Sequence, residues 1–127
     1  MKLRLLADTF AVAKLGSGAD LGAWAHAGAL VQIVRTPYEL SIVCRDAAIP
    51  AGVTAERGWR CFASADPLDI NQAGILASIS APLALAGISI FVISTFDNDY
   101  VLVRSDDLER TIETLERHGF TFEVTQV

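Results

Sequence analysis

Residues 88–104 divide into two apolar runs around a polar tip. The runs are Ile88–Ile93 and Tyr100–Val103, and the tip is Phe96–Asp99. β-branched and aromatic residues dominate both runs, and turn-forming residues dominate the tip, so the pattern predicts a β-hairpin. The first run is apolar at successive positions, which predicts a central strand with little solvent contact.

A similar pattern occurs 59 residues earlier in the chain. Residues 34–45 align with residues 93–104 without a gap, and Thr36 then falls on Thr95. Internal similarity at a fixed offset is typical of a repeated supersecondary element. The two hairpins therefore predict a duplicated unit, with chance similarity as the alternative.

Apolar positions over residues 2–15 predict either two short strands or one strand with a bend. Residues 19–29 carry enough Leu, Ala and Trp for a short helix, and residues 30–45 hold the first hairpin. Pro50 disfavours a long helix before the next predicted strand, Trp59–Asp66, so we expect only a turn or so between hairpin and strand.

Apolar residues recur at helical spacing after that strand and predict a helix over residues 72–86. These positions are Ile75, Leu76, Ile79, Leu83 and Ala86. We expect Asp69 or Asn71 to cap the start of this helix and Gly87 to end it. Pro82 removes one backbone hydrogen bond inside the helix and is expected to bend it.

A second helix is predicted after the later hairpin. Asp106 and Glu109 have the spacing of a capping box, the helix runs to about His118, and Gly119 ends it. Phe120–Val124 alternates and gives the last strand. The order from residue 59 onward is therefore β-α-β-β-α-β. It predicts an α+β, ferredoxin-like unit, with an antiparallel four-stranded sheet and both helices on one face.

The two hairpins divide the chain into two expected units, residues 1–60 and residues 61–127. The first unit offers the same plan as the second, with degenerate helices. A chain of 127 residues is long enough for one compact domain or two small fused subdomains. We expect two such units to share an interface inside one chain.

Composition and net charge limit the classes of partner that the chain can be expected to bind. Apolar residues make up 52% of the chain, which is typical of a globular protein with a large core. The net charge of −5 argues against a nucleic-acid or anionic-membrane partner, because either would need clustered Lys and Arg. The longest apolar stretch, Ile70–Ile93, is broken by polar residues, so no membrane span is expected, and no signal peptide is visible. Cys44 and Cys61 are expected to be buried thiols in a reducing cytoplasm, with a disulfide or a redox role as the alternative.

The residues that catalysis needs are not found in a recognisable arrangement. Neither histidine has a Cys, Asp or Glu nearby at metal-ligand spacing, so no metal site is expected. The Gly16-Ser17-Gly18 segment lacks the Lys and the spacing of a phosphate-binding loop, and the sequence has no Gly-x-Ser-x-Gly elbow. We therefore expect no enzyme activity and no cofactor.

Six strings, together with the element order and the duplication, resemble small bacterial ACT-domain proteins with tandem units. They are also similar to the ACT units of the eukaryotic cytosolic arginine sensors. The strings are Glu39–Cys44, Glu56–Arg60, Pro67–Asp69, Gly74–Ala77, Ala86–Phe91 and Ser94–Tyr100. The resemblance implies a regulatory module, because ACT units usually bind an amino acid or similar metabolite between two units and signal its presence.

The resemblance also implies a set of ligand-binding residues. They come from the start of the predicted helix, from the later hairpin and, across an interface, from the first unit: Asp69, Gln72, Ala73, Gly74, Ile75, Thr95, Phe96, Asp99, Ser41 and Ile42. Where the sensors carry a glutamate that helps to hold a cationic side chain, this chain has Gln72, whereas Asp99 keeps one carboxylate.

The chemistry of these residues suits an amino acid. Free N–H groups at a helix start suit a carboxylate, Gly74 allows close approach to the backbone, and the Ser41 hydroxyl suits an ammonium group. Asp99 suits a cationic or hydroxylated side chain. Three plainer interpretations stand beside these: residues 97–99 as a simple turn, Gly74 as a helix–sheet contact, and Thr95 as an ordinary strand residue.

The leading hypothesis is a non-enzymatic regulatory module that binds an amino acid or related small metabolite. It is expected to form a homodimer and to act on an unknown protein partner. The second hypothesis is a protein-interaction scaffold or dimeric adaptor that binds no ligand. A small enzyme with unrecognised residues is the third.

Overall fold

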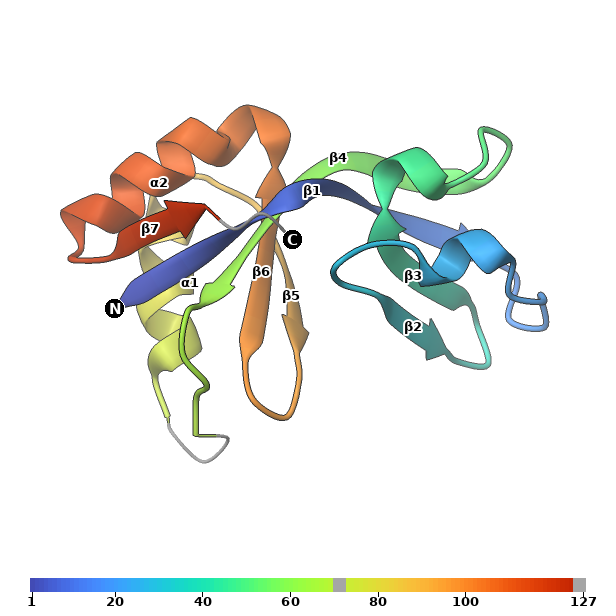
Figure 1. The fold of residues 1–127 in the computed structure, drawn as a ribbon, viewed down its shortest axis with the longest axis horizontal. Coiled ribbons are helices and arrows are strands. Elements are labelled where there is room, and N and C mark those ends of the chain that lie inside the picture. Colours follow the sequence, from blue (N-terminus) through green and yellow to red (C-terminus); the bar gives the residue numbers. More distant parts are fainter. Residues whose placement is uncertain (70–72, 125–127) are drawn as a thin grey trace. The chain divides into compact units, whose positions relative to one another are not determined.

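The computed structural model describes residues 1–69 and 73–124. Its contacts group the chain into two compact units. The C-terminal unit is Met1–Ala7 with Arg60–Gln126, and the N-terminal unit is Asp8–Trp59. Strands β1 (Lys2–Leu15) and β4 (Thr54–Ser64) contribute to both units (Figure 1).

The predicted division at residues 60/61 falls close to the point where β4 passes between the units. Met1–Ala7, which that division assigned to the first unit, instead supply a strand to the C-terminal unit. Residues 2–15 form one strand, which decides between the two alternatives for this stretch. The interpretation of the two segments as two ACT units stays a prediction.

The C-terminal unit contains the predicted β-α-β-β-α-β order. After β4 come α1 (Ile75–Leu85), β5 (Ile90–Ser94), β6 (Asp99–Arg104), α2 (Leu108–Arg117) and β7 (Thr121–Val124). The strands of this unit lie in the order β7-β1-β4-β6-β5. β5 and β6 are antiparallel, and β7 runs parallel to the start of β1.

One core lies between this sheet and its two helices. Ile79 and Leu83 from α1 and Leu115 from α2 pack with strand residues that include Leu3, Leu5, Phe62, Val101 and Val103. Leu83, Leu115 and Val103 are fully buried. Because strand side chains alternate between faces, Leu3 and Leu5 on β1 and Val101 and Val103 on β6 mark the helix-covered face.

Both helices end at the glycines that the sequence predicts as their C-terminal stops. Gly87 (φ 74°) and Gly119 (φ 89°) follow the last turns in left-handed conformations. The Ile88 N–H donates to the Leu83 carbonyl at 2.9 Å, and the Phe120 N–H donates to the Leu115 carbonyl at 3.1 Å. These bonds and the buried apolar residues that make them form Schellman motifs.

The predicted helix starts were wrong. α1 begins at Ile75 after Gly74, with no side-chain cap, so Asp69 does not cap it, and Asn71 lies outside the described residues. α2 begins at Leu108 after a 3-10 turn, η3 (Ser105–Asp107), and no side-chain hydrogen bond caps it. The capping box therefore does not form, because the 3-10 turn moves the helix start past Asp106.

The prediction of a central strand over residues 88–93 was also wrong. Among the described strands, β5 lies at the edge of the C-terminal unit and pairs with β6 alone. Ile90, Phe91 and Val92 are half-buried, and Ile93 is 3% exposed. Their unbroken apolar run therefore reflects partial burial on both faces of an edge strand.

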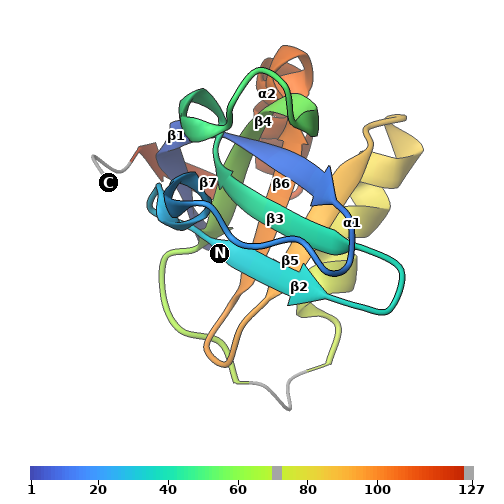
Figure 2. The same cartoon turned by 90° about the vertical axis from the view of Figure 1, so that its right-hand side faces the viewer.

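The N-terminal unit is smaller. β1 is followed by the 3-10 turn η1 (Ala23–His26), β2 (Gln32–Arg35), β3 (Leu40–Arg45) and the 3-10 turn η2 (Asp46–Ala48), before β4. β3 lies between β1 and β2, antiparallel to both (Figure 2). The short helix predicted over residues 19–29 is only one 3-10 turn. The core of this unit includes Ala11, Ala13, Ala25, Leu40, Ile42, Cys44 and Ile49.

In the described part of the chain, no helix is long and apolar enough to span a membrane.

Candidate functional site

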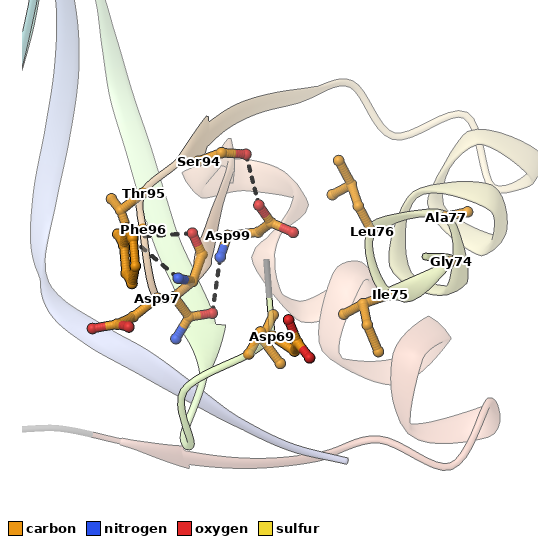
Figure 3. Close-up of a pocket in the computed structure, with 12 residues that line it drawn as sticks. Asp69, Gly74, Ile75, Leu76, Ala77, Ser94, Thr95, Phe96, Asp97 and Asp99 are labelled. Carbon is orange, nitrogen blue, oxygen red and sulfur yellow. Dashed lines mark hydrogen bonds between the residues drawn. The ribbon is translucent and has the colours of Figure 1, made fainter. Parts of the chain in front are cut away.

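A pocket of about 270 Å³ opens on the helix side of the C-terminal unit. Its walls are the first turn of α1, the loop that leads into α1, and the turn between β5 and β6 (Figure 3). Ser94 and Asp99 face the pocket because they pair across the hairpin, in register with Val101 and Val103 of the helix-covered core.

The β5–β6 turn is held by backbone and threonine hydrogen bonds. The Thr95 N–H donates to the Asn98 carbonyl at 2.8 Å, and the Asn98 N–H donates to Thr95 Oγ1 at 3.2 Å. The Asn98 side-chain oxygen accepts a bond of 2.9 Å from the Asp99 N–H. These bonds fix the position from which Asp99 enters the pocket.

Two further bonds join this turn to the loop before α1 and to the end of β4, from which that loop leaves. The Leu68 N–H donates to the Asp97 carbonyl at 2.6 Å, and Asn98 Nδ2 donates to the Ser64 carbonyl at 2.9 Å. The loop and the turn are distant in sequence, so these bonds hold two walls of the pocket at a set separation.

The start of α1 forms another wall. Gly74 takes the N-cap position with φ 88°, and its side of the backbone is open, since a Cβ there would meet nothing within 4 Å. This openness contradicts the interpretation of Gly74 as a helix–sheet contact. A helix start leaves its first N–H groups without intrahelical acceptors, and here the cap supplies no side-chain acceptor. The first turn can therefore receive an anion.

The opposite wall is rich in acceptors. Asp99 Oδ1 accepts a bond of 2.6 Å from the Ser94 hydroxyl, and the carboxylate of Asp99 points toward Leu76 (Figure 3). Asp69 also lines the pocket, whereas the carboxylate of Asp97 points away from α1. None of the described lining residues is Lys, Arg or His. The Asp99 carboxylate suits a cation, because the described residues that line the pocket offer it no positive side chain.

Six of the residues implied by the family resemblance line this pocket: Asp69, Gly74, Ile75, Thr95, Phe96 and Asp99. Ala73 is exposed and is not one of its lining residues, and Gln72 lies outside the described residues. Ser41 and Ile42 belong to β3 of the N-terminal unit, where Ile42 is fully buried. The site they were expected to complete stays a prediction.

Sequence reasoning missed six other lining residues: Leu68, Leu76, Ala77, Ser94, Asp97 and Asn98. Ser94 had a usable signal, because a hairpin that starts its second strand at Asp99 places Ser94 directly opposite. Leu68 had none, since its place depends on the hydrogen bond to Asp97.

Metal ligands and reactive thiols are two further features that could support catalysis. No group of three or more His, Cys, Asp or Glu residues in the described part of the chain is placed to hold a metal ion. Burial raises the pKa of the Cys61 thiol to about 12 and also raises the pKa of Cys44. Thiols with raised pKa values are poor nucleophiles at neutral pH, so both cysteines serve packing.

Comparison with known proteins identifies the family. A family model described as an ACT domain matches residues 54–117, about half of the chain. A second model, described as an N-terminal domain, matches residues 8–52. A protein from Agobacterium tumefaciens with a known crystal structure is 41% identical, covering 99% of this chain and 94% of that one with a TM-score of 0.92.

Two further comparisons match proteins with informative names. The human cytosolic arginine sensor for mTORC1 subunit 1 is 43% identical over 60 residues, which is 46% of this chain. The chain spans only 18% of the length of that curated relative. The aspartate kinase from Synechocystis shares the fold, with a TM-score of 0.68 at 18% identity over 99% of this chain and 28% of the kinase. The match to the ACT model and the long, 41% identical relative together show that this chain belongs to the ACT-domain family.

Proposed function

We propose that the protein is a non-enzymatic regulatory module whose C-terminal unit binds an amino acid or a similar small metabolite. One observation carries the proposal. A single pocket of about 270 Å³ has an uncapped helix start on one wall and an unneutralised carboxylate on another. Membership of the ACT family and similarity to an arginine sensor support the same class of function.

The two walls suit the two charges of a zwitterion. The N–H groups of Ile75, Leu76 and Ala77 receive the ligand carboxylate, where the positive end of the helix dipole adds to the hydrogen bonds. Asp99 receives an ammonium group or a cationic side chain, and the Ser94 hydroxyl keeps the Asp99 carboxylate in place. Half-burial of Asp99 strengthens this contact relative to one in open water.

The size of the ligand sets the expected affinity. A free amino acid has roughly ten heavy atoms, which allows about 4–8 kcal/mol of binding free energy, or millimolar to micromolar dissociation constants. A sensor of metabolite levels works in this range. The proposal includes a homodimer and a protein partner that reads the bound state, and it includes Ser41 and Ile42 as residues contributed from another ACT unit.

A second candidate is an interaction scaffold that needs no ligand. Residues 70–96 contain no charged side chain, and Leu85 on α1 is 90% exposed. Phe96, at the tip of the hairpin, is 81% exposed. Exposed large apolar groups in an uncharged segment favour contact with another protein.

Thermal unfolding with each of the twenty amino acids separates the two candidates. A ligand at a hundred times its dissociation constant adds about 2.7 kcal/mol to the free energy of unfolding. A sensor gives such a stabilisation with at least one amino acid, and a scaffold gives none with any of them.

Asp99→Asn then tests the site by calorimetric titration of the amino acid that stabilises most. The variant keeps the shape and a partner for Ser94 but loses the charge, so we expect affinity to fall about tenfold or more. Asp106→Asn removes an equal charge from an exposed position outside the pocket and is expected to bind like the native protein. Unchanged affinity in Asp99→Asn contradicts the proposed site.

A further inference from the structure

A second hollow, of about 320 Å³, lies against the same β5–β6 turn. Its charged or hydroxyl-bearing side chains include those of Arg4, Asp66, Asp97 and Tyr100, and it shares Thr95, Asp97 and Asn98 with the first pocket. We name it the Arg4 hollow.

Strand alternation puts the Arg4 hollow on the sheet face away from α1 and α2. Arg4 lies between Leu3 and Leu5, which belong to the helix-covered core, so its side chain leaves from the other face. Tyr100 precedes Val101 of the same core and is on that other face too. The two hollows therefore lie on opposite faces of the sheet and meet at one turn.

The charges in the Arg4 hollow are not paired with one another. Among the described residues, Arg4 forms no ion pair, and the same is true of the carboxylates of Asp66 and Asp97. Glu123 faces Arg4 in the β1–β7 register, but its carboxylate pairs with Lys2 at 3.7 Å. A half-buried guanidinium and two carboxylates thus line one hollow, and none of the three forms an ion pair with another described residue.

This arrangement discriminates between ligand classes. A simple anion would be attracted by Arg4 but repelled by the two carboxylates. A simple cation would be attracted by the carboxylates but repelled by Arg4. A small molecule that carries one charge of each sign satisfies both, and Arg binds carboxylates through paired N–H groups. The volume is in the range of small-molecule sites.

We propose that the Arg4 hollow is a second binding site, for a small zwitterion, with Arg4 holding its carboxylate and Asp66 and Asp97 its ammonium group. This site is separate from the pocket of the proposed function and does not depend on it. The shared turn gives a physical route for coupling, because a ligand that alters the Thr95–Asn98 bonds in one hollow changes the wall of the other.

Nuclear magnetic resonance titration tests the site residue by residue. The twenty amino acids are added singly to the native protein, and the signals of Arg4 Nε–H and of the Asp66 and Tyr100 amides are followed. We expect saturable shifts of these signals with at least one amino acid. Acetate alone and methylammonium alone are expected to bind at least about tenfold more weakly, because each lacks one charge.

Arg4→Gln identifies the group that binds the carboxylate. We expect it to weaken the saturable response at Tyr100 about tenfold or more. Lys14→Gln removes an equal charge from an exposed position on the same strand, outside the hollow, and is expected to leave that response unchanged. Three results overturn the proposal: no saturable shift with any amino acid, an equal response in Arg4→Gln, or acetate binding as tightly as the amino acid.

Discussion

The two hairpins of this chain, and the 3-10 turns that follow them, have equivalent backbone structure, and the two units then differ in the residues that follow those turns. In each, a threonine N–H donates to the carbonyl three residues on: Thr36 to Glu39 at 2.9 Å and Thr95 to Asn98 at 2.8 Å. In each, the threonine hydroxyl also accepts a bond from the N–H of that third residue. β3 and β6, and the 3-10 turns η2 and η3 after them, start and end at positions 59 residues apart.

After those turns, the backbone conformation first differs at Ile49 and at its counterpart, Leu108. Ile49 is extended, with ψ 123°, whereas Leu108 is helical, with ψ −48°, and begins α2. Pro50 favours the extended conformation of Ile49, because a residue before proline avoids the helical region. An α-helix follows the 3-10 turn in the C-terminal unit, and none follows it among the residues described for the N-terminal unit.

The hairpin ends differ in chemistry as well. Where the later hairpin pairs Ser94 with Asp99 in the candidate pocket, the earlier one pairs Arg35 with Leu40. The Arg35 guanidinium donates to the carbonyls of Ser17 and Ala19, and Leu40 is fully buried. The same backbone thus presents a carboxylate to a pocket in one unit, and a self-bound arginine with a core residue in the other.

The largest expected loss of stability comes from a substitution that removes the packing of a helix against the sheet, which is the feature that the described part of the N-terminal unit lacks. Leu83 is fully buried between α1 and the sheet of the C-terminal unit. Leu83→Ala should lower the free energy of unfolding by about 2–5 kcal/mol, through lost burial and a cavity. Leu85→Ala is the matched control, since Leu85 is on the same helix and 90% exposed, and should change stability by under about 0.5 kcal/mol. Similar values for the two variants in urea unfolding contradict the described core.

Substitutions at the helix ends are expected to have the next largest effect on stability. Gly119→Ala forces a Cβ into a left-handed position and should cost about 1–2 kcal/mol, because L-residues are strained there. Gly52→Ala is the control, since Gly52 has no positive φ and nothing lies near its Cβ position, and its effect should stay under about 1 kcal/mol. If thermal unfolding shows no loss in Gly119→Ala, the helix does not end as described.

The smallest effects should come from the turns themselves. Thr36→Ala and Thr95→Ala each remove a hydroxyl that bonds the backbone, and each should cost about 0.5–1.5 kcal/mol. Equal costs in urea unfolding support equivalent turns, and a cost in only one of them breaks the comparison. Thr54→Ala controls for loss of an exposed threonine in a strand.

The sequence predicts most of the fold where local chemistry decides it. Turn-forming tips mark both hairpins, and Gly87 and Gly119 mark both helix ends. It fails at the helix starts, because Gly74 and the turn before Leu108 use backbone conformation where a capping side chain was expected. The placement of Met1–Ala7 depends on pairing between β1 and β7, which lie at opposite ends of the chain, and no local pattern contains that information.

The candidate site is predicted in part for the same reason. Asp99 and Thr95 follow from the hairpin, and Gly74 and Ile75 follow from the start of the helix that precedes it. Leu68 is placed by its bond to the turn, and Asn98 by a bond to the end of β4 that spans 34 residues. Local patterning cannot show which loop closes over which turn.

A crystal structure grown with the amino acid that stabilises the protein most tests the central claim most directly. The account predicts the ligand in the pocket of the C-terminal unit, with its carboxylate on the N–H groups of the first turn of α1 and its cationic group against Asp99. An empty pocket, with the amino acid bound elsewhere or not at all, contradicts it.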